Sequence, residues 1–119
     1  MIPIKKDITA FQDVTCELAL YVRDKYKNNI DLSGCSAKMQ IRSAIDSEDV
    51  ILELSTDSDD EDNFLEITDE LGKIRLYIET VLLEYAGVYD LNLYSTSGKK
   101  YKPIKQSKFK VVGGVTRDS

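Results

Sequence analysis

The chain has 119 residues, the size of one domain, and 42% of them are hydrophobic, which is too many for a disordered chain. Its formal net charge is −5, and it contains neither histidine nor tryptophan. Without histidine, the sequence lacks the usual general base, a usual zinc ligand and the usual partner of a nucleophilic serine or cysteine. We therefore expect no enzymatic activity, and we assign no catalytic, cofactor-binding or metal-binding residues.

Composition also bears on where the protein is made. No run of about 18 apolar residues occurs, so the sequence predicts no transmembrane helix. The opening segment, MIPIKKDITAF, is too polar for a secretory signal. We expect a soluble protein that is made in the cytoplasm and does not bind membranes. In that compartment Cys16 and Cys35, which lie in apolar alternating segments, are expected to be free thiols that pack as small core residues.

Charge is distributed unevenly along the chain. Residues 1–42 carry seven basic and five acidic groups, residues 43–90 carry two and fifteen, and residues 91–119 carry seven and one. A nucleic acid would be repelled by the middle segment and attracted by the last one. The lysines of the last segment alternate with residues typical of strands, and no aromatic stacking platform accompanies them. We therefore expect no binding of nucleic acid, and no small-molecule substrate.

Alternation of apolar and polar residues with period two is the dominant pattern. Even positions are apolar between residues 14 and 23, and odd positions are apolar between residues 35 and 42. A polar, turn-rich stretch, residues 24–34, separates these segments. The pattern predicts two neighbouring strands of an antiparallel sheet with one face in water. The residues expected to face the core are Cys16, Leu18, Leu20, Val22, Ala37, Met39 and Ile41.

The rest of the chain predicts further short strands separated by turns. The polar run 55–63 is expected to be a loop, and Ser97-Gly98 a tight turn. Pro103 marks either an edge position or a bulge in the last strand, because proline cannot donate a hydrogen bond to a sheet. Tyr89, Leu91 and Leu93 are expected to point inward. The expected strands cover residues 50–54, 64–68, 73–79, 88–94 and 100–112.

A helical stripe is an alternative for two of these segments, because a period of 3.6 residues also fits their apolar positions. Gly72 and the β-branched Ile74 and Ile78 weaken the helical interpretation. One helical turn at residues 80–85 fits either interpretation. The residues of the helical stripe are Leu71, Ile74, Ile78 and Leu82 in one segment and Val14, Leu18 and Val22 in the other.

Seven or eight short strands with turns between them predict an all-β sandwich or barrel. Helices and strands do not alternate, so a parallel sheet is not expected. Residues 1–112 are expected to form one domain, whose first ten residues form an extended arm. Gly113-Gly114 opens a flexible C-terminal tail, residues 113–119.

A tyrosine corner is predicted at the start of the 88–94 strand. Leu83, a short turn, Gly87 and Tyr89 follow one another as they do in that motif. Its tyrosine ring fills the end of the core, and its hydroxyl bonds nearby backbone. Gly87 would let the chain reverse tightly before the strand. The alternative is an ordinary turn, and these residues are structural in either case.

Two acidic motifs suggest chemistry, and each has a structural alternative. Loop 57–62 offers oxygen ligands on alternate residues, as calcium requires, but it lacks the glycine and the final glutamate of an EF-hand. We expect a solvated loop, which is also suited to meet a basic surface of a partner. Asp69 and Glu70 would form an acid–base pair. They precede Leu71-Gly72, and adjacent strand residues point to opposite faces, so we expect a turn.

Four segments form an ordered pattern. Residues 31–42, DLSGCSAKMQIR, match D-L-T-G-hydrophobic-x-A-x-M-Q-I/V-R. Residues 72–78 match G-x-I-x-L-x-I, and residues 86–93 match A-G-x-Y-x-Y/F-D-L-x-L with shortened spacing. Residues 115–117 match a closing V-T-R. In this order the segments resemble those of small bacteriophage virion proteins, and the resemblance covers roughly residues 14–117.

The resemblance implies an antiparallel immunoglobulin-like β-sandwich with no catalytic residues. Related-looking modules include the N-terminal domain of phage baseplate upper proteins, which joins receptor-binding proteins to the tail. The expected protein is a virion structural protein: a tail-fibre adaptor, a baseplate piece or a capsid-associated piece. It would act in many copies in a symmetric assembly with other virion proteins of the tail, neck or capsid. The acidic insert 55–63 is longer and more charged than in the family, so no contact is carried over to it.

Docking would use a rigid sandwich through an edge strand or its end loops, since edge strands offer unpaired backbone groups. The last strand is expected to be such an edge, and its lysines would protect that edge in the free chain. Its positive charge is opposite to that of the acidic middle, so the two segments would steer copies into register. A second hypothesis is a small phage-encoded inhibitor or host-interaction protein that binds one partner. The lysines concerned are Lys100, Lys102, Lys105, Lys108 and Lys110.

Overall fold

The structure is a computed structural model, and it describes residues 3–43, 50–79 and 86–113. Three predictions therefore fall wholly or mostly outside the described residues. They are the helical turn at residues 80–85, the tail from residue 114 onward, and the V-T-R match at residues 115–117.

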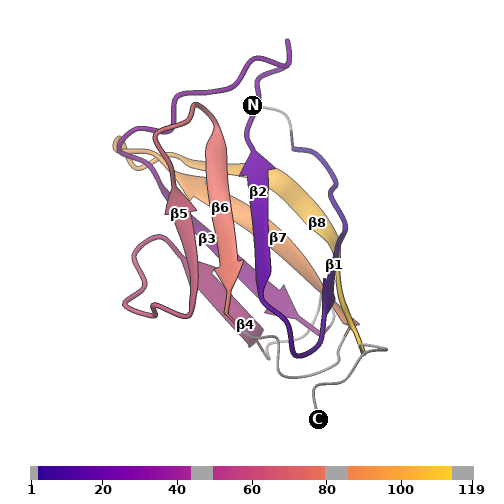
Figure 1. Cartoon of the computed structure of the whole chain (residues 1–119). Helices are drawn as coiled ribbons and strands as arrows, with labels where there is room; N and C mark the ends of the chain where they lie inside the picture. The colour runs from indigo at the N-terminus through magenta and orange to yellow at the C-terminus, as the bar shows by residue number, and fades with distance from the viewer. Residues whose placement is uncertain (1–2, 44–49, 80–85, 114–119) are drawn as a thin grey trace.

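The described residues form eight strands and no helix (Figure 1). None of these residues, accordingly, lies in a helix that is long and apolar enough to cross a membrane. The strands are β1 (Ile8–Phe11), β2 (Cys16–Tyr21), β3 (Ser36–Arg42), β4 (Val50–Ser55), β5 (Asn63–Ile67), β6 (Lys73–Ile78), β7 (Ala86–Tyr94) and β8 (Lys100–Val112).

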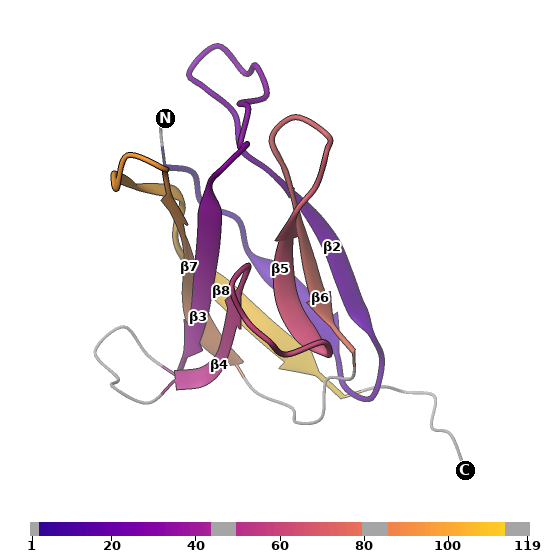
Figure 2. The same cartoon turned by 90° about the vertical axis from the view of Figure 1, so that its left-hand side faces the viewer.

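Two sheets make up the fold. One has five strands in the order β1-β8-β7-β3-β4, and the other has three in the order β2-β6-β5. Figure 2 shows the sheets as two layers, with the core between them. The predicted all-β sandwich is thereby confirmed. The segment of the helical alternative that contains Ile74 and Ile78 is strand β6, because its alternate residues are buried against the other sheet.

The prediction that the strands at 14–23 and 35–42 are neighbours is wrong. They are β2 and β3, and they belong to different sheets. The chain between them first folds back on itself, where Arg23 bridges Asn29 and Asp24 Oδ1 accepts the N–H groups of Tyr26 and Asn28. It then crosses to the other layer. Alternation shows that a segment is a half-buried strand, but it does not show which strand lies beside it.

Strand β1 lies within the expected extended arm and runs parallel to β8, whereas every other named pair is antiparallel. The expectation of an entirely antiparallel fold is therefore wrong at this one pair. Ile8 and Ala10 are buried in the core. Ahead of β1, the backbone N–H of Ile4 donates to the carbonyl of Pro103, and the Ile4 carbonyl accepts the N–H of Lys105.

Inward-facing residues from both layers fill the core, as alternation predicts. Tyr89, Leu91 and Leu93 of β7 are at most 2% exposed, so their predicted inward orientation is confirmed. The Tyr89 ring meets the Phe109 ring edge-on, with centroids 6.0 Å apart. Both cysteines are free, as expected: Cys16 is buried and Cys35 is half-buried. Burial raises the pKa of the Cys16 thiol.

The tyrosine hydroxyl bonds a different partner from the one that the tyrosine corner predicts. The Tyr89 hydroxyl donates to the carbonyl oxygen of Lys6, in the segment before β1. The Lys6 N–H in turn donates to Ser107 Oγ (2.8 Å), and Ser107 Oγ donates to the carbonyl of Lys105 (2.8 Å). The hydroxyl thus anchors the N-terminal segment to β7 and β8, a contact 83 residues away along the chain.

Gly87 also has a different role from the predicted one. It lies inside β7, and a Cβ atom there would sit 2.5 Å from the Arg42 carbonyl oxygen and 3.3 Å from Ile41 Cγ2 on β3. Its φ is not in the left-handed region, so a tight reversal is not what requires glycine. The requirement is the close approach of β3 to β7.

We expect Gly87→Ala to lower the free energy of unfolding by about 1–3 kcal/mol, because the added methyl group must push β3 away from β7. Urea unfolding followed by circular dichroism measures this change. Gly98→Asn is the control: Gly98 has nothing within 4 Å of its Cβ position, and asparagine tolerates the positive φ found there. Equal stability of the Gly87→Ala variant and the native chain would contradict the close-approach account.

Tyr89→Phe should cost about 1 kcal/mol, the net contribution of one hydrogen bond. Burial, together with the charge of Asp7, raises the pKa of the Tyr89 phenol above its usual value. Because the folded protein holds the phenol proton more tightly than the unfolded chain does, the shift contributes to the free energy of unfolding. This contribution is fully present below the unfolded-state pKa of about 10 and is lost as the pH rises above it. Native protein should therefore lose its advantage over Tyr89→Phe in alkali. Urea unfolding at neutral and at alkaline pH measures this difference. Tyr101→Phe, at an exposed tyrosine, serves as the control at each pH.

Candidate protein-docking surfaces

The lysines of β8 are on a sheet face, not on a free edge. β8 lies between β1 and β7, and where β1 does not reach, Ile4 bonds the Pro103 carbonyl and the Lys105 N–H on either side of Ile104, so the predicted edge position is wrong. The alternative prediction for Pro103, a bulge, is confirmed, because the β7–β8 register shifts between Leu91 and Leu93. In the second half of the strand, buried Ser107, Phe109 and Val111 alternate with Lys108 and Lys110. The exposed lysines are Lys100, Lys102, Lys105, Lys108 and Lys110.

Beyond β8 this face carries groups of both charges, because Asp90 lies on β7, Lys38 and Arg42 on β3, and Glu53 on β4. Lys102 Nζ lies 2.8 Å from Asp90 Oδ2 on β7. Further across, Arg42 Nη2 donates to Gln40 Oε1 (2.7 Å), and Gln40 Nε2 donates to Glu53 Oε2 (2.8 Å) on the edge strand β4. The hydrogen bond from Gln40 is the main reason that the pKa of Glu53 is lowered. These side chains are therefore held in place before any partner arrives.

The acidic loop that follows β4 begins at Asp57 and ends at Asp62. Its order comes from its own hydrogen bonds, since Asp60 Oδ1 accepts the backbone N–H groups of Asp62 (2.8 Å) and Asn63 (3.1 Å). The bond from Asp62 is the main cause of the lowered pKa of Asp60. The sequence predicted the loop, but an internal cap at Asp60 was not predicted.

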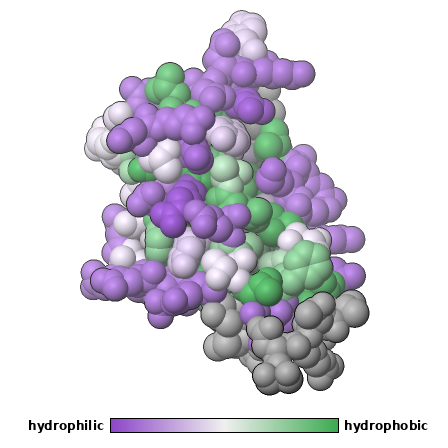
Figure 3. Space-filling view, viewed as in Figure 1, coloured by the Kyte–Doolittle hydropathy of each residue, from purple (hydrophilic) through white to green (hydrophobic). Residues whose placement is uncertain are grey.

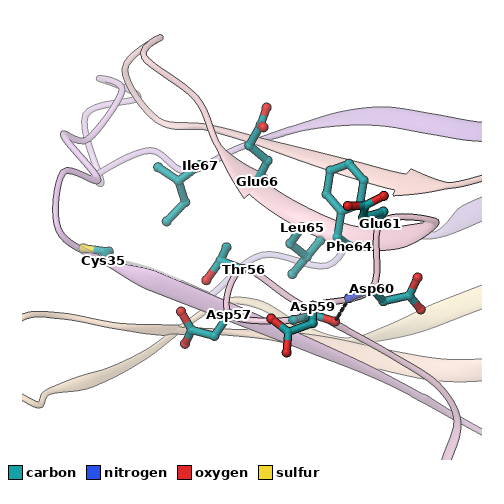
Figure 4. A pocket seen from close by; sticks show the side chains of 11 residues that line it. Cys35, Thr56, Asp57, Asp59, Asp60, Glu61, Phe64, Leu65, Glu66 and Ile67 are labelled. Carbon is teal, nitrogen blue, oxygen red and sulfur yellow. Dashed lines mark hydrogen bonds between the residues drawn. The ribbon is translucent and has the colours of Figure 1, made fainter.

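An open hollow lies between the acidic loop and β5. Figure 4 shows Ile67 and Glu66 on one side of it and the side chains of Asp57 and Asp59 on the other. Cys35 lies at one end. Within the described ranges, no three carboxylate or thiol groups lie close enough together to share a metal ion. The hollow is thus an indentation of the surface between an acidic rim and apolar side chains.

The paired carboxylates Asp69 and Glu70 lie in the turn between β5 and β6, as the turn interpretation predicts. Both are exposed. Glu70 forms an ion pair with Lys73 (3.4 Å), and its carbonyl accepts the Lys73 N–H. Both carboxylates therefore lie at the surface of a turn, and that of Glu70 is held by Lys73.

An arginine cluster on the outer face of the three-stranded sheet was not found by sequence reasoning. Arg75 Cζ lies 5.4 Å from the centroid of the Phe64 ring and 5.2 Å from that of Tyr77. Its Nε lies 2.8 Å from Glu17 Oε1, and its Nη1 lies 3.4 Å from Glu66 Oε1. The five residues come from three strands, so only the register brings them together. Arginine and tyrosine are the residue types enriched where proteins bind tightly.

Comparison with known proteins supports the fold and no closer relationship. No family model and no curated protein matches the chain in sequence. Among solved structures, the chain is similar to one from the crystal structure of the ZIG-8-RIG-5 IG1-IG1 heterodimer. The identity is 10%, the TM-score is 0.52, and the match covers 92% of this chain and 84% of that one. The chain is therefore an immunoglobulin-like β-sandwich.

We expect calcium and magnesium, compared at equal ionic strength, to give the same thermal unfolding midpoint. The described carboxylates of the acidic loop do not converge on one point, so either ion only screens their mutual repulsion. Differential scanning fluorimetry measures the midpoint, and isothermal titration calorimetry measures binding. Saturable calcium binding that disappears in Asp60→Asn would show that the loop is a calcium site.

Proposed function

We propose that this chain is a non-enzymatic structural module of a bacteriophage particle, where many copies dock to other virion proteins of the tail, neck or capsid. The ordered resemblance of residues 31–42, 72–78 and 86–93 to small virion proteins supports the placement in a particle. The observation that carries the docking role is the outer face of the five-stranded sheet, with lysines along β8 and an acidic loop beyond β4.

Rigidity makes this face suitable for docking. β7 is hydrogen-bonded to β8 on one side and to β3 on the other, so the outward side chains of all three strands keep fixed spacings. Lys102 and Gln40 are already engaged with Asp90 and Glu53. A surface ordered in advance loses little conformational entropy when it binds.

Separation of charge gives the face a direction. A partner with acidic groups would be drawn to the β8 side, and a partner with basic groups to the acidic loop. Such patterns raise association rates and exclude wrong partners more than they raise affinity. Strand addition at β8, the route expected from the sequence, is replaced in this proposal by contact with the sheet face, because β1 and Ile4 cover the edge of β8.

The similar fold gives limited further support. In the crystal structure of the ZIG-8-RIG-5 IG1-IG1 heterodimer, the proteins are joined through their IG1 domains. A sandwich of this class is therefore compatible with docking to another protein.

Mass spectrometry of purified particles tests the placement. We expect peptides of this chain at stoichiometric copy number. Absence from particles, together with capture of one host enzyme by the free monomer, would replace the proposal with the small inhibitor or host-interaction protein.

Charge reversal tests the docking face. Exchanging Lys105, Lys108 and Lys110 for glutamate should reduce incorporation into particles at least about tenfold, equivalent to about 1.4 kcal/mol. Lys102 is left in place because it pairs with Asp90. Reversal of exposed Lys25 and Lys27, in the segment between β2 and β3, is the control. Unchanged assembly of the β8 variant would rule out this face, and loss of nucleic-acid retention instead would show that it binds nucleic acid.

A further inference from the structure

Strand β2 has one open side. It is an outer strand of the three-stranded sheet and pairs with β6 alone. Figure 3 shows green, hydrophobic surface along the side of β2 that faces β1. Leu18 on β2 is only half-buried although it points inward, whereas Leu20 is 1% exposed.

The hydrogen-bond pattern shows which groups of β2 face the open side. Val22 N–H donates to the Gly72 carbonyl (2.7 Å), so the even-numbered residues of this strand bond β6. Alternate residues must turn their N–H and C=O groups the other way. Those residues are Glu17, Ala19 and Tyr21, and no other described segment pairs with them.

We propose that two copies of this chain pair through their β2 edges, antiparallel, about a two-fold axis at Ala19. Ala19 then faces Ala19 of the second copy, and Glu17 faces Tyr21 of the second copy. Each facing pair exchanges two backbone hydrogen bonds, because all three residues present both groups on this side. The two three-stranded sheets become one continuous sheet, and alanine at the axis presents no bulky side chain to the other copy.

Charge favours this register. Arg23 follows Tyr21 on the same outward face, with its Cζ 5.4 Å from the centroid of the Tyr21 ring and its Nε bonded to Asn29 Oδ1 (3.1 Å). Glu17 lies opposite Tyr21 of the second copy and therefore diagonal to its Arg23, within reach of a long side chain. The symmetry makes this opposite-charge contact twice.

Apolar surface at the two ends of β2 is also complementary. Val14 and Phe11, before β2, are 49% and 54% exposed. At the other end a hollow is lined by Ile4, Tyr21 and Pro103, and by charged residues that include Arg23 and Lys25. Antiparallel pairing brings the Val14 end of one copy to the hollow of the other. The exposed apolar groups then leave water at both ends of the interface.

Two other edge strands, β5 and β4, fit strand addition less well. On β5, the N–H of Asn63 is already bonded to Asp60 Oδ1, and Leu65 is only 2% exposed. On β4, a register shift at the Ile41–Arg42 step breaks the regular pattern, and Glu53 guards the edge. Among these, β2 is the edge whose backbone groups are both regular and accessible.

This dimer goes beyond the proposed function, since it would form whether or not the chain belongs to a particle. Analytical ultracentrifugation of the full chain from micromolar to millimolar concentration should show monomer and dimer in equilibrium. Hydrogen exchange followed by NMR should show the amides of Glu17, Ala19 and Tyr21 gaining protection as the dimer forms, while those of Leu18 and Leu20 are protected throughout. A monomer at every concentration, or a dimer in which these three amides still exchange rapidly, overturns the inference.

Charge exchange tests the register. Glu17→Lys and Arg23→Glu should each raise the dimer dissociation constant about tenfold, since each substitution acts at both symmetry-related contacts. An equimolar mixture of the two variants should restore the native value, because the lysine of Glu17→Lys then lies diagonal to the glutamate of Arg23→Glu and the other contact keeps its native pair. Failure of the mixture to do so overturns the register.

Glu66→Lys is the matched control. Arg75 forms ion pairs with both Glu17 and Glu66, and each substitution removes one of them. Glu66, however, lies on β5, away from the β2 edge. Glu66→Lys should leave the dissociation constant unchanged, and an equal effect of both substitutions would assign the change to the Arg75 cluster. If Glu17→Lys does not fold, Arg23→Glu carries the test, because Arg23 is exposed. Detection in particles by mass spectrometry decides the proposed function separately.

Discussion

Strand β7 is hydrogen-bonded on both sides, and its inward residues Tyr89, Leu91 and Leu93 occupy the centre of the core. This double pairing constrains everything around it. β3 can approach β7 closely only because Gly87 has no side chain. On the other side, β8 presents Phe109 to the Tyr89 ring, and the Tyr89 hydroxyl draws in the N-terminal segment at Lys6. Because hydrogen bonds to both neighbours position β7, the positions of the outward side chains of the five-stranded sheet are fixed relative to one another.

The surfaces follow from the same arrangement. Basic residues are concentrated on the last strand and acidic residues in the middle of the chain, and the strand order places β8 and β4 on opposite sides of one sheet. A separation along the sequence thereby becomes a separation in space. The three-stranded sheet differs, because its central Arg75 is enclosed by two aromatic rings and two carboxylates. The charges on its outer face are largely paired with one another, and the interaction that we propose for this sheet uses the open edge of β2.

Much of the fold was predictable because burial of one sheet face imposes period two on every strand. Seven of the strands coincide with segments predicted as strands, and Tyr89, Leu91 and Leu93 point inward as alternation requires. β1 was missed because four residues are too few to establish a period, and only its contact with β8 defines it as a strand. The Arg75 cluster was missed for a related reason: Glu17, Phe64 and Arg75 are distant in sequence, and only pairing in register joins them.

By itself, the sequence determined that the chain is all-β, a sandwich or a barrel, with an acidic middle and a basic last strand, since these depend on local alternation and composition. Which strands pair was decided only by the tertiary structure. The turn-rich segment 24–34 is compatible with a hairpin or with a crossing between sheets, and only packing of both layers selects the crossing. The crossing left β2 with an open side, and pairing of β1 with β8 placed the β8 lysines on a sheet face. Hydrogen-bond partners in a sheet are set by long-range packing and not by neighbours in the chain.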